Sequence, residues 1–120
     1  MMIFKNFFND IDSIIERDPA ASSRISVILL YPTVHILFLY KISNFLWKKK
    51  LRFLARLLMQ IGRIFTGIEI HPGAKIGNRL FMDHGYGIVI GETAEIGDNC
   101  LLYQGVTLGG TGKSHGKRHP

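Results

Sequence analysis

One histidine in this chain has the residue type and the neighbours for chemistry. It lies in the run Asp83-His84-Gly85-Tyr86-Gly87. Imidazole is the side chain whose ordinary pKa lies nearest neutrality, so it can accept a proton from a substrate under physiological conditions. A lone histidine is more often structural, but this one interrupts a regular repeat. The sequence therefore predicts a catalytic role for His84.

The repeat consists of aliphatic residues spaced six positions apart in the second half of the chain. They are Ile70, Ile76, Met82 and Ile88, then in shifted phase Ile90, Ile96, Leu102 and Leu108, with small residues at Ala94, Cys100 and Val106. A six-residue period fits neither a helix nor a hairpin, and is typical of parallel β-helices with inward aliphatic side chains. The interval from Met82 to Ile90 is eight, so a two-residue irregularity falls around His84.

A glycine-rich and basic segment follows the repeat, from Gly109 to Pro120. We expect an excursion loop over 109–120, whose backbone N–H groups and basic side chains suit a phosphate or a carboxylate. A solvated loop without a ligand is the alternative. The Gly112-Lys113-Ser114 run matches the end of a nucleotide-binding motif, but Thr107 stands where that motif needs its first glycine, so a P-loop is excluded.

The first half of the chain has helical spacing of apolar residues and contains one of the 13 glycines. This spacing predicts four helices in residues 1–66. The first runs from Ile3 to Asp18-Pro19, the second is capped by Ser22 or Ser23, the third follows a break at Pro32, and the fourth ends near Gly67. The fold class is therefore mixed, with a helical region before the repeats.

Composition and charge reduce the classes of function that the chain could have. With 120 residues, 47% of them hydrophobic and 20% charged, the chain is expected to fold. The net charge of +6 arises within residues 1–66. Its densest run, Lys48 to Arg52, is expected to connect two helices, with a lipid or polyanion contact as the alternative. No motif that reads nucleic acid accompanies this charge, so we expect no nucleic-acid partner.

Cysteine content and apolar segments indicate the compartment. The single cysteine, Cys100, cannot form an intramolecular disulfide, and no cleavable signal peptide is visible at the start, so a cytoplasmic location is expected. Cys100 occupies an inward repeat position and is not expected to be a nucleophile. The apolar segment 26–40 is too short to cross a bilayer, so we expect no membrane span.

Four motifs of the second half occur in a specific order. They are GIEIHPGAKIG at 67–77, DHG at 83–85, GETA at 91–94 and GVTLGGTGK at 105–113, continuing to RHP at 118–120. Together they resemble serine O-acetyltransferase, a hexapeptide-repeat acyltransferase, in its compact bacterial form. Asp18-Pro19-Ala20 and the helices also look like that family. The resemblance implies an α+β fold with a helical region at 1–66 and a left-handed parallel β-helix at 67–120.

The resemblance also implies an activity. Serine O-acetyltransferases transfer acetyl from acetyl-CoA to the hydroxyl of L-serine, giving O-acetyl-L-serine for cysteine biosynthesis, by direct attack without an acyl-enzyme. It implies acetyl-CoA as co-substrate, no metal, and L-cysteine as an inhibitor. A homotrimer or a dimer of trimers is expected. O-acetylserine sulfhydrylase is a possible partner in the family, but we expect its docking tail to be absent here.

Residue roles follow from the same resemblance. His84 matches the general base, and Glu69 matches the carboxylate that pairs with it. The other implied positions are Asp83, Glu92 and Asp18 around the amino-acid substrate, Arg118 and His119 facing its carboxylate, and Gly110 and Thr111 near the thioester arm of CoA. His35 and His71 are interpreted as packing or turn residues.

The chain differs from the family pattern at its end, where the family continues with further coils beyond the match to Pro120. We expect a fragment that carries most of the serine site and little of the CoA site, with doubtful activity. Two other functions stay open. One is a sugar or polysaccharide O-acetyltransferase, against which Asp83, Glu92 and Arg118 argue; the other is a non-catalytic trimerising module.

Overall fold

Along the chain, helices occupy the first half and short parallel strands the second. The computed structural model describes residues 2–110, 112 and 116–120, with side chains from residue 7 onward. Within these residues the helices are α1 (Met2–Arg17), α2 (Arg24–Leu30), α3 (Pro32–Lys48) and α4 (Arg52–Thr66). The strands are β1 (Glu69–Ile70), β2 (Lys75–Ile76), β3 (Phe81–Asp83), β4 (Val89–Ile90), β5 (Glu95–Ile96), β6 (Leu101–Tyr103) and β7 (Thr107–Leu108).

The ends of the helices follow from local chemistry. α1 ends before Asp18, and α2 begins after Ser23, whose hydroxyl accepts from the Ser26 N–H while Ser26 accepts from the Ser23 N–H. Pro32 occupies the first turn of α3, where its missing N–H costs nothing. Gly67 ends α4 with a φ of 73°, a left-handed conformation that glycine adopts without strain. The four predicted helices are thus confirmed.

The strands form three narrow parallel sheets, in the orders β1-β4-β7, β2-β5 and β3-β6. Paired residues are twenty positions apart between β1 and β4, β2 and β5, and β3 and β6, but eighteen apart between β4 and β7. The two additional residues of the first coil lie between β3 and β4. The predicted irregularity around His84 is therefore confirmed by the strand register.

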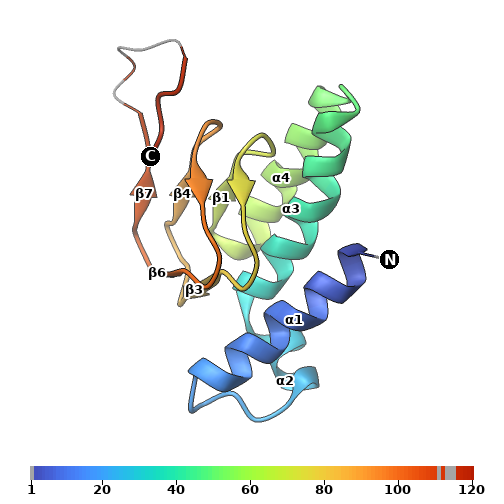
Figure 1. The fold of residues 1–120 in the computed structure, drawn as a ribbon, viewed down its shortest axis with the longest axis vertical. Helices are drawn as coiled ribbons and strands as arrows, with labels where there is room; N and C mark the ends of the chain where they lie inside the picture. The colour runs from blue at the N-terminus through green and yellow to red at the C-terminus, as the bar shows by residue number, and fades with distance from the viewer. Residues whose placement is uncertain (1, 111, 113–115) are drawn as a thin grey trace.

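The inward aliphatic positions build one core with the helices. Ile70, Met82, Ile88 and Ile90 are buried, and Ile76, Ile96, Leu102 and Leu108 pack partly buried against them. The same cluster contains Ile36, Leu37, Tyr40 and Met59 of α3 and α4. In Figure 1, β1, β4 and β7 lie progressively farther from these two helices. The helices thus cover the first coil.

Side chains of α3 also satisfy the edge of that first coil. Thr33 Oγ1 accepts from the N–H of Met82 at 3.1 Å, and Asn44 Nδ2 donates to the carbonyl of Pro72 at 2.8 Å. Such edge groups would otherwise lack partners in a buried layer. The helices therefore replace a preceding coil both in apolar packing and in hydrogen bonding.

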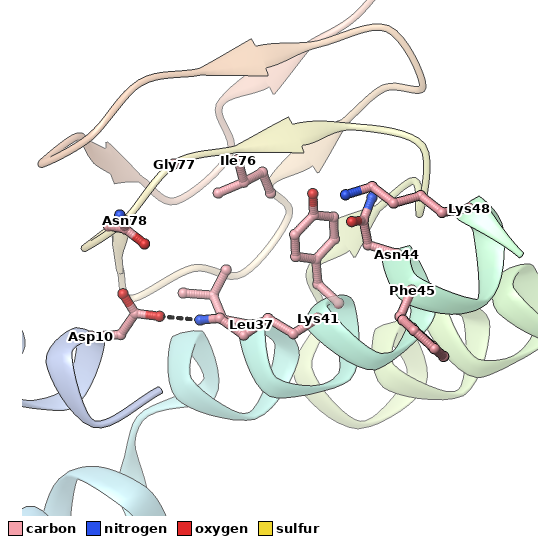
Figure 2. A pocket seen from close by; sticks show the side chains of 10 residues that line it. Asp10, Leu37, Lys41, Asn44, Phe45, Lys48, Ile76, Gly77 and Asn78 are labelled. Atoms are coloured by element: carbon pink, nitrogen blue, oxygen red, sulfur yellow. Dashed lines mark hydrogen bonds and ion pairs between the residues drawn. The ribbon is translucent and has the colours of Figure 1, made fainter. Parts of the chain in front are cut away.

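A carboxylate of α1 fastens the layers together. Asp10 Oδ2 lies 2.5 Å from Lys41 Nζ of α3, and Asp10 Oδ1 accepts from the N–H of Arg79 at 2.8 Å. The Asp10 side chain is only 6% exposed. Figure 2 shows this ion pair at the edge of a pocket of about 290 Å³ between α3 and the turn after β2. Asp10 thus joins α1, α3 and the coil.

The apolar segment 26–40 and the basic run Lys48 to Arg52 both lie in the helical region. No single helix within the described residues is both long and apolar enough to cross a bilayer; α2 and α3 meet that test only together, and they are bent by 79° at their junction. Lys49 and Lys50 are exposed and connect α3 to α4. The interpretation of this run as a connection between helices is confirmed.

Candidate functional site

The first cluster of predicted site residues lies at the corner between β3 and β4, residues 83–87, which we name the His84 corner. His84 has a φ of 63°, and Gly85 and Gly87 are also left-handed. Such backbone is uncommon for a residue with a side chain and is concentrated at functional sites. A Cβ on Gly85 would lie 2.7 Å from Ile68 Cδ1. The local packing thus requires glycine directly after His84.

The additional residues turn the imidazole out of the coil. The His84 side chain is 75% exposed, and its Nε2 lies 3.9 Å from Asp83 Oδ1. The pKa of Asp18, directly after α1, is lowered mainly by hydrogen bonds from Tyr31 and Ala20, and the His84 imidazole adds a smaller contribution. The corner can therefore present a base to a ligand outside the coil.

Tyr31 organises the acidic part of this corner. Its hydroxyl donates to Asp18 Oδ2 at 2.6 Å, while the N–H of Ala20 donates to Asp18 Oδ1 at 2.9 Å. The Tyr31 hydrogen bond is the main reason that the pKa of Asp18 lies below its ordinary value. The same bond, with burial and the nearby carboxylates, raises the pKa of Tyr31 to about 12. Tyr31 was not predicted from the sequence, which has no motif around it.

Glu69 lies at the start of β1. Its Oε1 is 3.4 Å from Arg63 Nε at the end of α4. Within the described part of the chain, no hydrogen bond or ion pair joins Glu69 to His84. The predicted pairing of Glu69 with the imidazole stays a prediction.

The second cluster lies at the corner between β4 and β5, residues 91–94, which we name the Thr93 corner. The segment 116–120 returns to this corner and places Arg118 beside Glu92, with 2.5 Å between the guanidinium and Oε1. This hydrogen bond is the main cause that lowers the pKa of Glu92. The adjoining cavity of about 500 Å³ is lined by charged and polar side chains, among them Arg56, Glu69, His71, Glu92, Arg118 and His119. Opposite charges suitable for a zwitterion therefore meet here.

Thr93 attaches the returning segment to the coil. Its Oγ1 accepts from the N–H of Arg118 at 3.0 Å and from the N–H of His119 at 2.9 Å. The N–H of Thr93 donates to His119 Nδ1 at 3.1 Å. Thr93 belongs to the GETA motif at 91–94. No spacing in the sequence indicates that its hydroxyl contacts Arg118 and His119, which lie 25 and 26 positions later.

The remaining loop positions are partly described. A Cβ on Gly110 would lie 2.8 Å from the carbonyl oxygen of Arg118, so the two halves of the loop pass closely there. Thr111, the other residue predicted near the arm of CoA, lies outside the described residues. Its role, like that of Gly110, stays a prediction.

The two histidines interpreted as structural do make structural contacts. His71 Nδ1 accepts from the N–H of Gly73 at 3.0 Å, its ring lies edge-on to Trp47 with 4.8 Å between ring centroids, and burial lowers its pKa. His35 Nε2 lies 2.5 Å from the carbonyl oxygen of Ile28. These contacts agree with an interpretation as packing or turn residues, and His71 also lines the cavity beside Arg118.

The predicted site residues thus gather at two corners. Asp18, Asp83 and His84 are close at one, and Glu92, Arg118 and His119 at the other. No hydrogen bond or ion pair joins the two groups in the part of the chain that the structure describes. The described residues also contain no group of three or more His, Cys, Asp or Glu side chains that could hold a metal ion.

Comparison with known sequences gives a consistent result. No family model matches the chain. Serine acetyltransferases of Bacillus licheniformis and Bacillus subtilis are 58% and 57% identical over 119 residues, which is 99% of this chain and 55% of each relative. That of Helicobacter pylori strain 26695 is 56% identical over 110 residues, 92% of this chain and 64% of the relative. The chain spans about half the length of most of these relatives.

Solved structures agree with the sequences. A soybean serine acetyltransferase complexed with serine has a TM-score of 0.94 at 37% identity, covering 98% of this chain and 49% of that one. An Entamoeba histolytica serine acetyltransferase isoform 3 in complex with cysteine has a TM-score of 0.93 at 43% identity, covering 99% and 42%. Over its own residues, by sequence and by fold, the chain belongs to the serine acetyltransferase family.

Proposed function

We propose that this chain forms the serine-binding and proton-accepting part of a serine O-acetyltransferase. The complete reaction transfers acetyl from acetyl-CoA to the hydroxyl of L-serine and yields O-acetyl-L-serine and CoA. One observation carries the proposal: an exposed imidazole and a carboxylate–guanidinium pair occupy two corners of a chain 56–58% identical to serine acetyltransferases along almost its whole length.

In this proposal His84 acts as the general base. Its imidazole takes the serine hydroxyl proton while the serine oxygen attacks the thioester carbonyl carbon. The C–O bond forms, the C–S bond breaks, and the proton passes to the departing thiolate. Asp83 and Glu69 stabilise the imidazolium in this step. General-base assistance of this kind contributes roughly 10²- to 10⁴-fold in rate.

The Thr93 corner would recognise the amino-acid ends of the substrate. Arg118 and His119 face its carboxylate, and a planar guanidinium suits a carboxylate through paired hydrogen bonds. Glu92, Asp83 and Asp18 supply negative charge for its ammonium group. The Entamoeba structure with cysteine supports L-cysteine as a competitor for these contacts. Gly110 and Thr111 are proposed to border the acetyl-CoA arm.

The finer architecture belongs to the same proposal. The hexapeptide repeats are expected to wind as a left-handed β-helix over residues 67–120, after a helical region at 1–66. α4 leaves Phe53, Ile64 and Phe65 more than three-quarters exposed, which supports association with further copies of the chain. In a homotrimer or a dimer of trimers, the two corners of different copies can meet in one site. We propose a cytoplasmic location.

An acceptor comparison tests the function. Release of the CoA thiol from acetyl-CoA is measured with L-serine and with a panel of sugars. The protein used here and in all activity measurements below is this chain extended by the further coils that the family has after the match to Pro120, as wild type and as His84→Ala. We expect serine-dependent release that disappears in the variant, with an unchanged oligomer by light scattering. Release with sugars equal to that with L-serine would favour the polysaccharide alternative, because a sugar lacks the charges that match Glu92 and Arg118.

A further inference from the structure

Thr93 uses its entire hydrogen-bonding capacity on the returning segment. A threonine hydroxyl has one proton to donate and two lone pairs to accept with. Both lone pairs are occupied, because Oγ1 accepts from the N–H of Arg118 and from the N–H of His119 at 3.0 and 2.9 Å. The hydroxyl proton must therefore point elsewhere, and His119 Nδ1 lies 2.7 Å from Oγ1.

The same count of hydrogen-bond donors and acceptors determines which nitrogen of the His119 ring carries the proton. Nδ1 also receives the N–H of Thr93 at 3.1 Å, so two donors point at this nitrogen. A proton on Nδ1 would oppose both of them. The ring proton of a neutral imidazole must then reside on Nε2.

Two further contacts hold the ring and the segment in place. A Cβ on Gly91 would lie 2.1 Å from His119 Cδ2 and 2.2 Å from Nε2, so the ring lies directly against the glycine backbone. Lys117 Nζ donates to the carbonyl of Thr93 at 2.6 Å. The ring position is thus defined on one side by Thr93 and on the other by Gly91. Nε2 belongs to a residue that lines the same cavity as Arg118 and Glu92.

We propose that Thr93 is a positioning residue that holds His119 as the neutral Nε2–H tautomer, so that His119 donates a hydrogen bond to the substrate carboxylate beside Arg118. The carboxylate contact rests on the proposed function; the tautomer does not. Thr93 touches no substrate in this proposal and acts only through residues 117–119.

Nitrogen-15 NMR of the histidine rings tests the tautomer on the 120-residue chain. At mildly alkaline pH, His119 is expected to show an unprotonated Nδ1 and a protonated Nε2, without the averaging that exchange between the two tautomers produces. His119→Gln identifies the signals. Thr93→Val should move His119 toward the averaged pattern, and Thr93→Ser should restore a single tautomer. A protonated Nδ1, or no change in Thr93→Val, would overturn the proposal.

Binding measurements test the consequence. L-serine is compared by calorimetry with ethanolamine, which is serine without its carboxylate. The preference for L-serine is expected to fall about tenfold in Thr93→Val and to return in Thr93→Ser. Gly91→Ala, which displaces the ring but keeps the threonine, should lower the preference similarly. Undiminished preference in both Thr93→Val and Gly91→Ala would contradict the assigned contact.

Thr107→Val provides a matched control, because it makes the same change on exposed β7, where the threonine hydroxyl forms no hydrogen bond to the described residues. It should leave both the tautomer and the preference unchanged. The two proposals fail differently. If the wild type binds no L-serine while the Thr93-dependent tautomer is present, the proposed function is wrong and the positioning role stands. If L-serine binds but the tautomer is independent of Thr93, the positioning role is wrong and the proposed function stands.

Discussion

The His84 corner and the Thr93 corner present polar side chains by different means. At the His84 corner, two additional residues and three left-handed backbone positions turn one imidazole outward. At the Thr93 corner the coil keeps its regular period, and the polar groups of Arg118 and His119 arrive from a segment 25 residues later.

The two corners therefore place their functional side chains in two ways, one by a local irregularity of the backbone and one by a segment that returns from later in the chain. A local irregularity changes the direction of a side chain by itself, because the backbone around it has few alternatives once Gly85 and Gly87 are in place. A returning segment depends on its contacts with the coil. Here the Thr93 hydroxyl accepts from two N–H groups of the segment, Arg118 pairs with Glu92, and the N–H of Glu95 donates to the carbonyl of Pro120. We therefore expect loss of the His84 imidazole at the first corner to affect the chemical step, and substitutions at the second corner to affect substrate binding.

The largest expected effect is that of His84→Asn. Asparagine tolerates the left-handed backbone at this position but cannot act as a base near neutrality. We expect kcat to fall roughly 10²- to 10⁴-fold with little change in KM for L-serine. Thiol-release kinetics measure the effect, and an unchanged thermal midpoint shows that the corner stays folded. A variant with wild-type kcat would show that the imidazole is not the base.

A substitution away from both corners should change stability alone. Asp10→Ala removes the partner of Lys41 and the acceptor for the Arg79 N–H, both in a largely buried layer. We expect the free energy of unfolding to fall by about 2 to 3 kcal/mol in urea titrations. Asp12→Ala, which breaks an exposed pair with Arg24, is the matched control and should destabilise the protein clearly less, because an exposed ion pair is screened by solvent. Equal losses would mean that the layers are joined elsewhere.

Arg118→Lys should change binding at the Thr93 corner. Lysine keeps the charge but cannot form paired hydrogen bonds with a carboxylate. The lost contact is worth about 2 kcal/mol, which is roughly a thirtyfold increase in KM for L-serine. KM for acetyl-CoA and kcat should stay close to the wild type. A fall in kcat with constant KM would place Arg118 in the chemical step and would break the distinction between the corners.

The smallest expected effect is on the stability of the protein at acidic pH. The Arg118 guanidinium lowers the pKa of Glu92 from its ordinary value of 4.5. A folded-state pKa below the unfolded one stabilises the protein above pH 4.5, and this stability is lost as pH falls through the lowered value. The pair is about one-third exposed, so the contribution should stay below about 1 kcal/mol. Urea titrations from neutral to acidic pH should show a smaller acid loss in Glu92→Gln than in the wild type.

Much of the fold could be predicted because it repeats. Each aliphatic residue at the six-residue period occupies an equivalent inward position, so Ile70, Ile90 and Leu108 support one another as evidence for stacked coils. The interval between Met82 and Ile90 then located the irregular corner. Helix ends followed from Ser23, Pro32 and Gly67, because capping and left-handed backbone depend on residue type.

The polar contacts could not be predicted in the same way. The bond from Tyr31 to Asp18 and the pair of Arg63 with Glu69 each join single residues that belong to no period. The resemblance associated Glu69 with His84, but resemblance to a family carries no coordinates for one chain. Thr93 belongs to a sequence motif, but its role depends on residues 117–119, which contact it only in the folded chain.

By itself the sequence determined which side chains face inward and where the repeat is interrupted, because burial every six residues and glycine at left-handed positions are local requirements. The tertiary structure alone decided which polar groups meet. A loop can close on a coil in many registers at similar entropic cost, and tertiary contacts select one of them, among them the hydrogen bonds to Thr93, the pair of Arg118 with Glu92 and the space above Gly91.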